Sequence, residues 1–250
     1  MARRGLGEAT NAAVFAAAPS SKDDPKDEKP HYHGHRERLR QRFLEGGAES
    51  LPDYELLELI LFAIPRKDTK KLAKDLIAAF GSLAEVVSAD ANKLADFPSL
   101  GDTGATALKA VQAAAQRLLR TEMKNTEIIS SWQALVDYLT VKAGYEPIEQ
   151  FRVLYLDRKN KLILDEALGR GTVDHTPVYP REVVKRALEL NASALILAHN
   201  HPSGDPKPSR ADIDMTRKVK DALATVNITL HDHVVIGRGG HVSFKSEGLL

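Results

Sequence analysis

The sequence contains no cysteine, and this absence removes a whole set of chemistries. Disulfide scaffolds, thiol nucleophiles, iron–sulfur clusters and cysteine-ligated zinc sites all require that residue. An excess of one charge is also missing, because 35 basic residues face 34 acidic ones and the formal net charge is +1. This balance excludes a protein that binds nucleic acid by bulk positive charge alone, and it excludes an acidic tail protein.

No stretch of the sequence is long and apolar enough to suggest a membrane span. The longest apolar run, Leu56–Ile64, is interrupted by Glu58 and falls far short of the roughly 20 residues that a membrane-spanning helix needs. An alanine-rich patch at 12–18 is weaker and shorter than the core of a signal peptide. We therefore expect a cytoplasmic protein without membrane contact. Hydrophobic residues still form 43% of the chain, which is enough to bury a sizeable core.

The sequence divides into three segments of different composition. Residues 1–30 end in prolines and alternating charges with few large apolar groups, so we expect a disordered tail there. Over 34–123 apolar residues recur at helical spacing and no strand pattern occurs, which predicts a small all-α domain. A polar link over 124–127 leads to the third segment.

The third segment, 127–250, alternates helical and strand patterns, which predicts an α/β domain with a mixed sheet flanked by helices. The run at 194–198 is continuously apolar, as expected of a strand covered on both faces. Helices are expected over 131–141, 180–190 and 209–224, and further strands over 151–156, 162–164, 172–178 and 228–236.

Two histidines stand at the end of that apolar strand. Side chains two residues apart on a strand share a face, so His199 and His201 can point at one metal ion, and Asp212, one turn into the next helix, can return a carboxylate to it. Such a set leaves a fourth tetrahedral position open, as in catalytic zinc sites. The alternative is two surface histidines beside an ordinary helix cap, but the buried strand and the aspartate together favour the metal site.

The spacing of these residues resembles the sequence motif of a known enzyme family. His-x-His-Pro, six residues and Ser-x-x-Asp is the pattern of the JAMM metalloproteases, which have a JAB/MPN-type domain. Asn200, the sequences at 203–205 and 208–209, and further matches at 171–173, 180–182 and 232–237 make it similar to the bacterial RadC family over 34–250. The resemblance implies one zinc ion per chain held by His199, His201 and Asp212. It also implies that Ser209 helps to polarise the carbonyl of a peptide or protein substrate.

Ser209 has a second interpretation, because Ser-x-x-Asp after a proline is also close to a capping box at the start of a helix. The two roles need not exclude each other. The general base is less clear from the residues alone. In JAMM enzymes a glutamate at the start of a strand beside the histidine strand takes this role, and Glu149 occupies the matching place. Glu146 and Glu166 stay open as alternatives.

The segment containing His231, Asp232 and His233 offers a possible second metal pair on one strand face. No carboxylate follows at a useful spacing, so a packed role, or one supporting the first site, is the better interpretation.

The helical segment contains a stretch at 94–108 that resembles a helix-hairpin-helix, a motif in which backbone N–H groups can bind a DNA phosphate. It departs from the usual Gly-x-Gly: Ser99 replaces the first glycine, Gly104 is extra, and Asp102 would repel a phosphate. Packing of two helices is at least as good an explanation. Four arginines at 36–42 form the one concentrated basic patch, although a solvated helix face explains them equally well.

Three classes of function compete. The first is a zinc-dependent hydrolase that cleaves amide or isopeptide bonds with Glu149 as general base. The second is a DNA-associated protein, either a metal-dependent nuclease or a repair accessory that uses the helical domain; two-metal nuclease chemistry would need more clustered carboxylates. The third is a metal-stabilised interaction module without turnover, which the complete ligand set and the candidate base disfavour.

Overall fold

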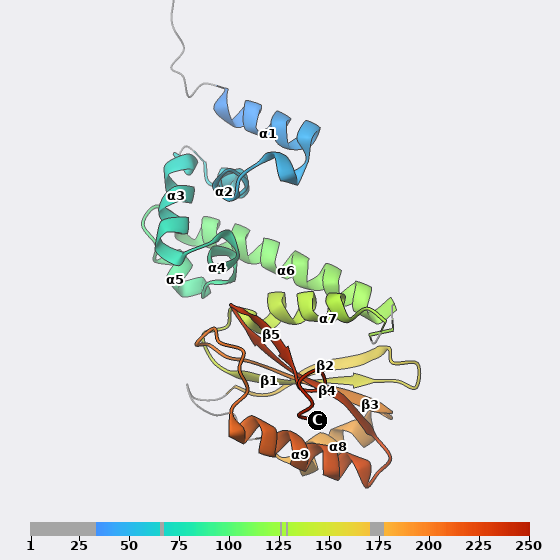
Figure 1. Ribbon diagram of the computed structural model, residues 1–250. Coiled ribbons are helices and arrows are strands. Elements are labelled where there is room, and N and C mark those ends of the chain that lie inside the picture. Colours follow the sequence, from blue (N-terminus) through green and yellow to red (C-terminus); the bar gives the residue numbers. More distant parts are fainter. Residues whose placement is uncertain (1–33, 66–67, 126, 129, 171–177) are drawn as a thin grey trace, which may run out of the picture.

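The computed structural model describes residues 34–65, 68–125, 127–128, 130–170 and 178–250 (Figure 1). It consists of a helical N-terminal region followed by a mixed five-stranded sheet with helices on both faces. The predicted fold class is therefore confirmed. The tail expected over 1–30 lies outside the described residues.

The helical region is built around one apolar core, which includes the fully buried Leu57, Leu76 and Leu108. The helices that begin at residues 69, 83 and 91 start at the capping side chains of Asp68, Ser82 and Asp90; the Asp68 carboxylate, for example, accepts a hydrogen bond from the backbone N–H of Lys71. The elements are α1 (His35–Gly46), a 3-10 turn (Ala48–Ser50), α2 (Asp53–Ile60), a 3-10 turn (Leu61–Ala63), α3 (Thr69–Phe80), α4 (Leu83–Ser88), α5 (Ala91–Ala95) and α6 (Gly101–Asn125).

Helix α6 is longer than its sequence pattern suggests. It begins at Gly101 and continues to Asn125, so the first half of the polar link expected at 124–127 is helical. The alanine-rich sequence explains this extension, because nothing between Ala105 and Asn125 interrupts a helix. Figure 1 shows α6 running from the helical region along the sheet, beside α7, so that one helix belongs to both halves of the molecule.

The second half has the strand order β2-β1-β3-β4-β5, in which β3 and β4 are parallel and the other neighbours are antiparallel. All seven residues of β3 are buried, as the continuous apolar run predicts. The elements are α7 (Trp132–Leu139), a π-helical turn (Thr140–Gly144), β1 (Gln150–Leu156), β2 (Leu162–Arg170), α8 (Pro180–Glu189), β3 (Ala194–Asn200), α9 (Arg210–Ala224), β4 (Thr229–Gly237) and β5 (Gly240–Ser243).

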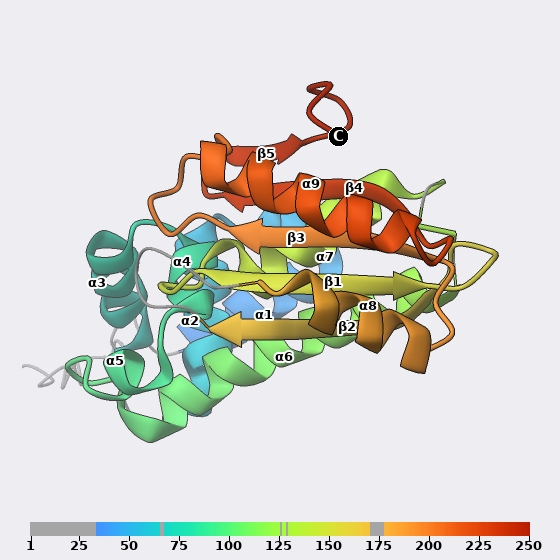
Figure 2. The same ribbon diagram turned by 90° about the horizontal axis from the view of Figure 1, so that it is seen from below.

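The sheet lies between two layers of helices, as Figures 1 and 2 show, and an apolar core fills the space on each side of it. One layer joins α7 to the face of the sheet that carries Leu154 and Ile196. The other joins α8 and α9 to the opposite face, which carries Val153 and Leu197. Because β3 lies in the middle of the sheet, its carboxyl end is held from both sides.

Two strands of the second half differ from the sequence-based expectation, and one expected strand lies almost entirely outside the described residues. Strand β5 is too short and too polar for its pattern to predict it. Glu166 lies within β2, which extends to Arg170 and is longer than expected. The strand expected over 172–178 falls outside the described residues except for Val178, which is not in a strand. Within the described ranges, none of the helices combines the length and the apolar character that a membrane crossing requires.

Candidate metal centre

The three predicted metal ligands meet at the carboxyl end of β3. His199 is in β3, His201 follows it directly, and Asp212 lies in the first turn of α9. The loop between them folds back on β4, where the backbone N–H of His201 donates to the carbonyl of Ile236 at 2.8 Å. Gly237 permits this close approach, since a Cβ there would lie only 2.3 Å from the carbonyl oxygen of Gly204.

The donor atoms of the three side chains lie close to the spacing that a tetrahedral metal ion needs. The His199 and His201 Nε2 atoms are 3.0 Å apart, and an oxygen of Asp212 lies 3.5 Å from the first and another lies 3.7 Å from the second. Ligand atoms at about 2.0–2.1 Å from tetrahedral zinc are about 3.3–3.4 Å from one another. One ligand atom from each residue can be chosen so that all lie within 4.8 Å. The residues present therefore fit a metal ion.

Hydrogen bonds orient both imidazoles from behind. The Nδ1 atom of His201 lies 2.8 Å from the carbonyl oxygen of Asp205, and the Nδ1 atom of His199 lies 2.8 Å from Nε2 of His233. A carbonyl can only accept, so His201 carries its proton on Nδ1 and leaves the Nε2 lone pair for a metal. Phe151, which pairs with His199 in the β1–β3 register, stacks on the His199 ring.

The Asp212 carboxylate caps its own helix and also contacts both histidines. Oδ2 accepts hydrogen bonds from the backbone N–H and the hydroxyl of Ser209, at 2.7 and 2.6 Å, while the Ser209 Oγ accepts the Asp212 N–H. This is the capping box that the sequence suggests. Oδ1 lies 3.5 Å from His199 Nε2, and the capping oxygen Oδ2 lies 3.7 Å from His201 Nε2. The helix cap therefore aims the carboxylate at the histidines and leaves Oδ1 outside its own hydrogen bonds.

The electrostatics of the cluster favour a positive charge at its centre. Burial alone would raise the pKa of Asp212, but its contacts with His199 and His201 and the hydrogen bond from Ser209 outweigh burial and hold that pKa well below its ordinary value. The same contact with Asp212 raises the pKa of His201. Protons and metal ions compete for such a site, because ligand imidazoles must be deprotonated.

Glu149 approaches this cluster from β1. It directly precedes that strand, and Phe151, two residues later, lies opposite His199. Alternation along the chain gives Glu149 the same face as Phe151 and therefore the face of the histidines. Its charge also contributes to the raised pKa of His201. Glu149 therefore precedes a strand that lies beside the histidine strand, as expected. Its role as general base stays a prediction.

The two alternative carboxylates have other surroundings. Glu166 accepts a hydrogen bond from Arg186 of α8 at 2.9 Å, with both side chains about one-third exposed. Glu146 lines a cleft beside the helical region, and its charge acts on Lys109 of α6. Both carboxylates therefore interact with basic side chains away from the histidine pair, whereas the charge of Glu149 acts on His201.

Asn200 is a functional candidate that sequence reasoning missed. It is completely buried between the two histidines and points to the opposite face of the sheet. Its Oδ1 accepts the N–H of Gln150 at 2.8 Å, and its Nδ2 donates to the carbonyls of Glu146 and Ile148, both at 3.2 Å. These three bonds clamp the segment that carries Glu149. The only signal in the sequence is the polar residue between the histidines.

Replacement of Asn200 by Asp is expected to lower turnover while the metal stays bound. A carboxylate cannot donate to the carbonyls of Glu146 and Ile148, so the segment that holds Glu149 shifts. A displacement of about 1 Å can cost about a hundredfold in rate. Turnover and zinc content would be measured beside Asn227→Asp, an exposed asparagine near the end of α9. Unchanged turnover in Asn200→Asp would show that the clamp is dispensable.

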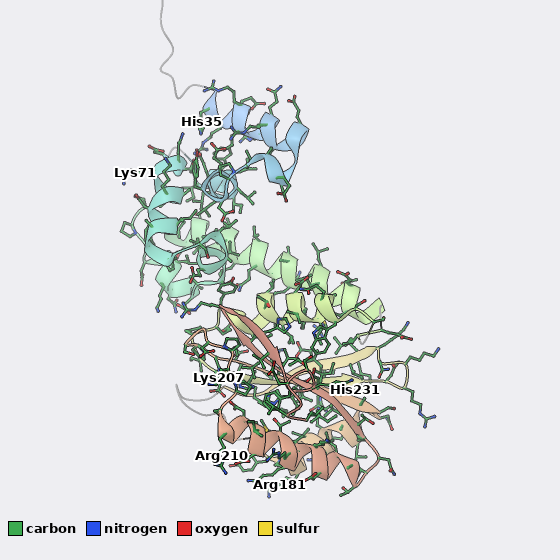
Figure 3. All side chains as sticks on the ribbon, in the orientation of Figure 1. His35, Lys71, Arg181, Lys207, Arg210 and His231 are labelled. Atoms are coloured by element: carbon green, nitrogen blue, oxygen red, sulfur yellow. The ribbon has the colours of Figure 1, made fainter. Side chains whose placement is uncertain are left out.

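The structure separates His231 from His233. A register irregularity in the β3–β4 pairing sends His231 to the turn after β1, where its Nε2 lies 2.8 Å from Oδ1 of Asn160 (Figure 3). His233 lies against His199 in the interior, and burial lowers its pKa well below the ordinary value. Asp232 accepts hydrogen bonds from Ser243 and from the backbone of Lys245. His231 and His233 therefore do not form a metal pair, and His233 has the packed position beside the first site that the sequence favours.

The hairpin between α5 and α6 keeps the turn geometry of its motif despite the serine. Ser99 has a φ of 69° and Gly101 a φ of 62°, both in the left-handed region. Gly104 is explained by packing, because a Cβ there would lie 2.3 Å from a methyl carbon of Leu100. Asp102 is exposed in the first turn of α6.

The arginines of α1 mostly attach this helix to its neighbours. The guanidinium groups of Arg36 and Arg40 lie over the ring of Phe62, at 4.8 and 5.4 Å from its centroid. Arg42 pairs with Glu55 of α2. These arginines of the basic patch therefore help to hold α1 against its neighbours, a role that the sequence did not reveal.

A cleft of about 330 Å³ lies between the helical region and the end of the sheet beside the metal centre. Arg238, in the turn after β4, crosses it and reaches Glu85 of α4 at 3.5 Å and the carbonyl of Pro202 at 3.1 Å. Figure 2 shows α3 and α4 on the side of the molecule where β3 ends. The lining residues are Phe80, Glu85, Ala89, Asp90, Lys93, Gly144, Tyr145, Glu146, Pro147, Pro202 and Arg238.

Two comparisons with known proteins agree with this geometry. Residues 129–249 match the model of a family described as a RadC-like JAB domain. A UPF0758 protein from Rhodobacter capsulatus is 59% identical over 213 residues, which cover 85% of this chain and the full length of that relative.

Proposed function

Because the chain belongs to the RadC (UPF0758) family, we propose that it is a zinc-dependent hydrolase that cleaves an amide or isopeptide bond in a peptide or protein. The observation that carries this proposal is the pair of Nε2 atoms 3.0 Å apart with the Asp212 carboxylate beside them. Two imidazole nitrogens and one carboxylate suit zinc, and a three-residue set leaves a coordination position for water.

His199, His201 and Asp212 would hold the zinc ion, one per chain. When bound, zinc acts as a Lewis acid and lowers the pKa of a water ligand towards neutrality. The Glu149 carboxylate takes the proton of the attacking water and then hands it to the departing amine. Neither histidine can perform this transfer, because its Nε2 would be committed to the metal and its Nδ1 to a hydrogen bond.

Ser209 would assist at the substrate carbonyl. Its hydroxyl is part of the helix cap and lies 2.6 Å from Asp212 Oδ2, so it sits at the edge of the metal centre. Rotation of the hydroxyl towards a substrate carbonyl would cost this one bond, while the Ser209 N–H would still hold the carboxylate at 2.7 Å. The cap therefore supports a dual role for Ser209.

A polymeric substrate is supported by the cleft beside the metal centre. Pro202 lines it and directly follows His201, and Pro147 lines it two residues before Glu149. A polypeptide whose amide reaches the metal centre could extend into this cleft and contact the helical region. Lys207 and Arg210 lie at the loop end of α9 (Figure 3), where both side chains are exposed.

The test is hydrolysis of a defined panel. Zinc-loaded protein, metal-stripped protein and stripped protein with zinc restored would be incubated with a mixture of unmodified peptides and lysine-linked isopeptides, and products would be identified by mass spectrometry. We expect cleavage that is lost on stripping and recovered with zinc. Cleavage that is equal with and without metal would contradict the proposal, as would metal-dependent cleavage of DNA with every amide left intact.

A DNA contact through the helical region is the second candidate function, and the left-handed turn at Ser99 and Gly101 is the observation in its favour. Arg36, Arg40 and Arg42 of α1 contact neighbouring residues in the protein, and the negative charge of Asp102 would repel a phosphate. Any DNA binding is therefore expected to be weak and independent of sequence.

We expect the DNA affinity to fall steeply with salt. If about three phosphates are neutralised, a fourfold increase in salt should weaken binding about 40-fold. Fluorescence anisotropy of labelled duplexes of two unrelated sequences across a salt series measures this. Tight, salt-insensitive or strongly sequence-selective binding would refute the prediction.

A further inference from the structure

A buried chain of hydrogen bonds connects two of the predicted metal ligands through residues that do not touch the metal position. His199 Nδ1 lies 2.8 Å from His233 Nε2, and His233 Nδ1 lies 2.6 Å from the hydroxyl of Thr216. That hydroxyl lies 2.6 Å from the backbone carbonyl oxygen of Asp212. His199, His233 and Thr216 are each at most 1% exposed, so water does not compete for these bonds.

The direction of each hydrogen bond follows from the number of available protons. The contact between the Thr216 hydroxyl and the Asp212 carbonyl needs a proton, and only the hydroxyl can supply it. Thr216 has no second proton, so the contact with His233 needs a proton on His233 Nδ1. A neutral His233 then has a lone pair on Nε2, and His199 must donate from Nδ1.

We infer that Thr216 and His233 are positioning residues that hold His199 in its Nδ1–H form and thereby present its Nε2 lone pair to the metal. This inference rests on the proposed metal site and adds two residues to it. Neither residue would bind the metal or the substrate. The reversed chain, with the proton on His233 Nε2, would put the His199 proton on Nε2 and block that ligand.

The chain also couples the two elements that carry the ligands. Thr216 is one helical turn after Asp212 on α9, and His233 lies on β4 next to the His199 strand. The His233 ring is held between Phe151 and Phe244, with centroid distances of 5.6 and 4.5 Å. The position of α9 and the proton on His199 are therefore linked. Partners of metal-bound histidines commonly have this orienting effect.

Thr216→Val is the sharpest test, because valine matches the shape of threonine and removes only the hydroxyl. The proton on His233 Nδ1 then has no acceptor, so the tautomer with the proton on Nε2 is favoured. That tautomer donates to His199 Nδ1 and reverses the direction of the hydrogen bonds. We expect the zinc affinity to fall about 10- to 100-fold, as for other partners of metal ligands. Thr216→Ser keeps the hydroxyl and is expected to retain the wild-type affinity.

The zinc affinity would be measured by competition with a chromogenic chelator, and the histidine protons by 15N NMR of the imidazoles. Both readouts are independent of substrate, so a protein that binds zinc but cleaves no peptide would contradict the proposed function and leave this inference standing. Thr216→Val with wild-type zinc affinity would overturn the inference.

The NMR measurement on the wild-type protein decides the matter if Thr216→Val does not fold or if zinc does not bind. We expect His233 to carry its proton on Nδ1 and not on Nε2, with or without zinc. In the zinc-loaded protein His199 should also be protonated on Nδ1. A proton on His233 Nε2 in either state would overturn the inference.

Discussion

Glu149→Gln is expected to keep its zinc and to lose turnover by at least about a hundredfold, the contribution of a missing general acid–base group. Glutamine has the size and hydrogen-bonding reach of glutamate but cannot accept the proton of the attacking water. The prediction follows from the position of Glu149 at the start of β1, on the histidine face, with its charge acting on His201.

The matched controls are Glu166→Gln and Glu146→Gln. Glu166 is bonded to Arg186, and Glu146 lies in the cleft near Lys109, so we expect much smaller effects on turnover from either change. Zinc content and turnover of the same substrate would be compared across the three variants. A Glu149→Gln protein that holds zinc and works at the wild-type rate would show that another carboxylate is the base.

The double variant His199→Ala/His201→Ala is expected to lose essentially all of its zinc and all metal-dependent activity. Two of the three ligands are removed, and Asp212 alone cannot hold the ion at ordinary concentrations. The loss of His199 also leaves the buried Nε2 atom of His233 without its hydrogen-bond partner, so some loss of stability is expected as well.

His241→Ala is the control for this second experiment, because His241 is exposed in β5. Elemental analysis of the purified variants would be combined with circular dichroism to confirm that the double variant is folded. Zinc retained at the wild-type stoichiometry in a folded double variant would place the metal elsewhere.

The sequence predicts those parts of the site that depend on local pattern. A continuous apolar run identifies β3, and two histidines at its end must share a face because strand side chains alternate. Pro208 and Ser209 identify the start of α9 and therefore the position of Asp212. These features depend on neighbours within a few residues, and the described structure has each of them.

The parts that sequence pattern misses depend on contacts between distant segments. The clamp formed by Asn200 joins β3 to the segment just before β1, about 50 residues earlier in the chain. The alternation of side chains along β3 shows which face Asn200 occupies but not which residues it contacts. Thr216 looks like an ordinary helical residue, and its role depends on a histidine of β4. A register irregularity in the β3–β4 pairing separates His231 from His233, and no local pattern reveals it.

The central claim is that one metal ion sits among His199, His201 and Asp212, and crystallography at the zinc absorption edge tests it most directly. Crystals of zinc-loaded wild-type protein would be measured on both sides of the edge. We predict one strong anomalous peak per chain, about 2.0–2.2 Å from Nε2 of both histidines and from a carboxylate oxygen of Asp212. Zinc-loaded crystals without a peak at that position, or with their strongest peak at other residues, would contradict the account.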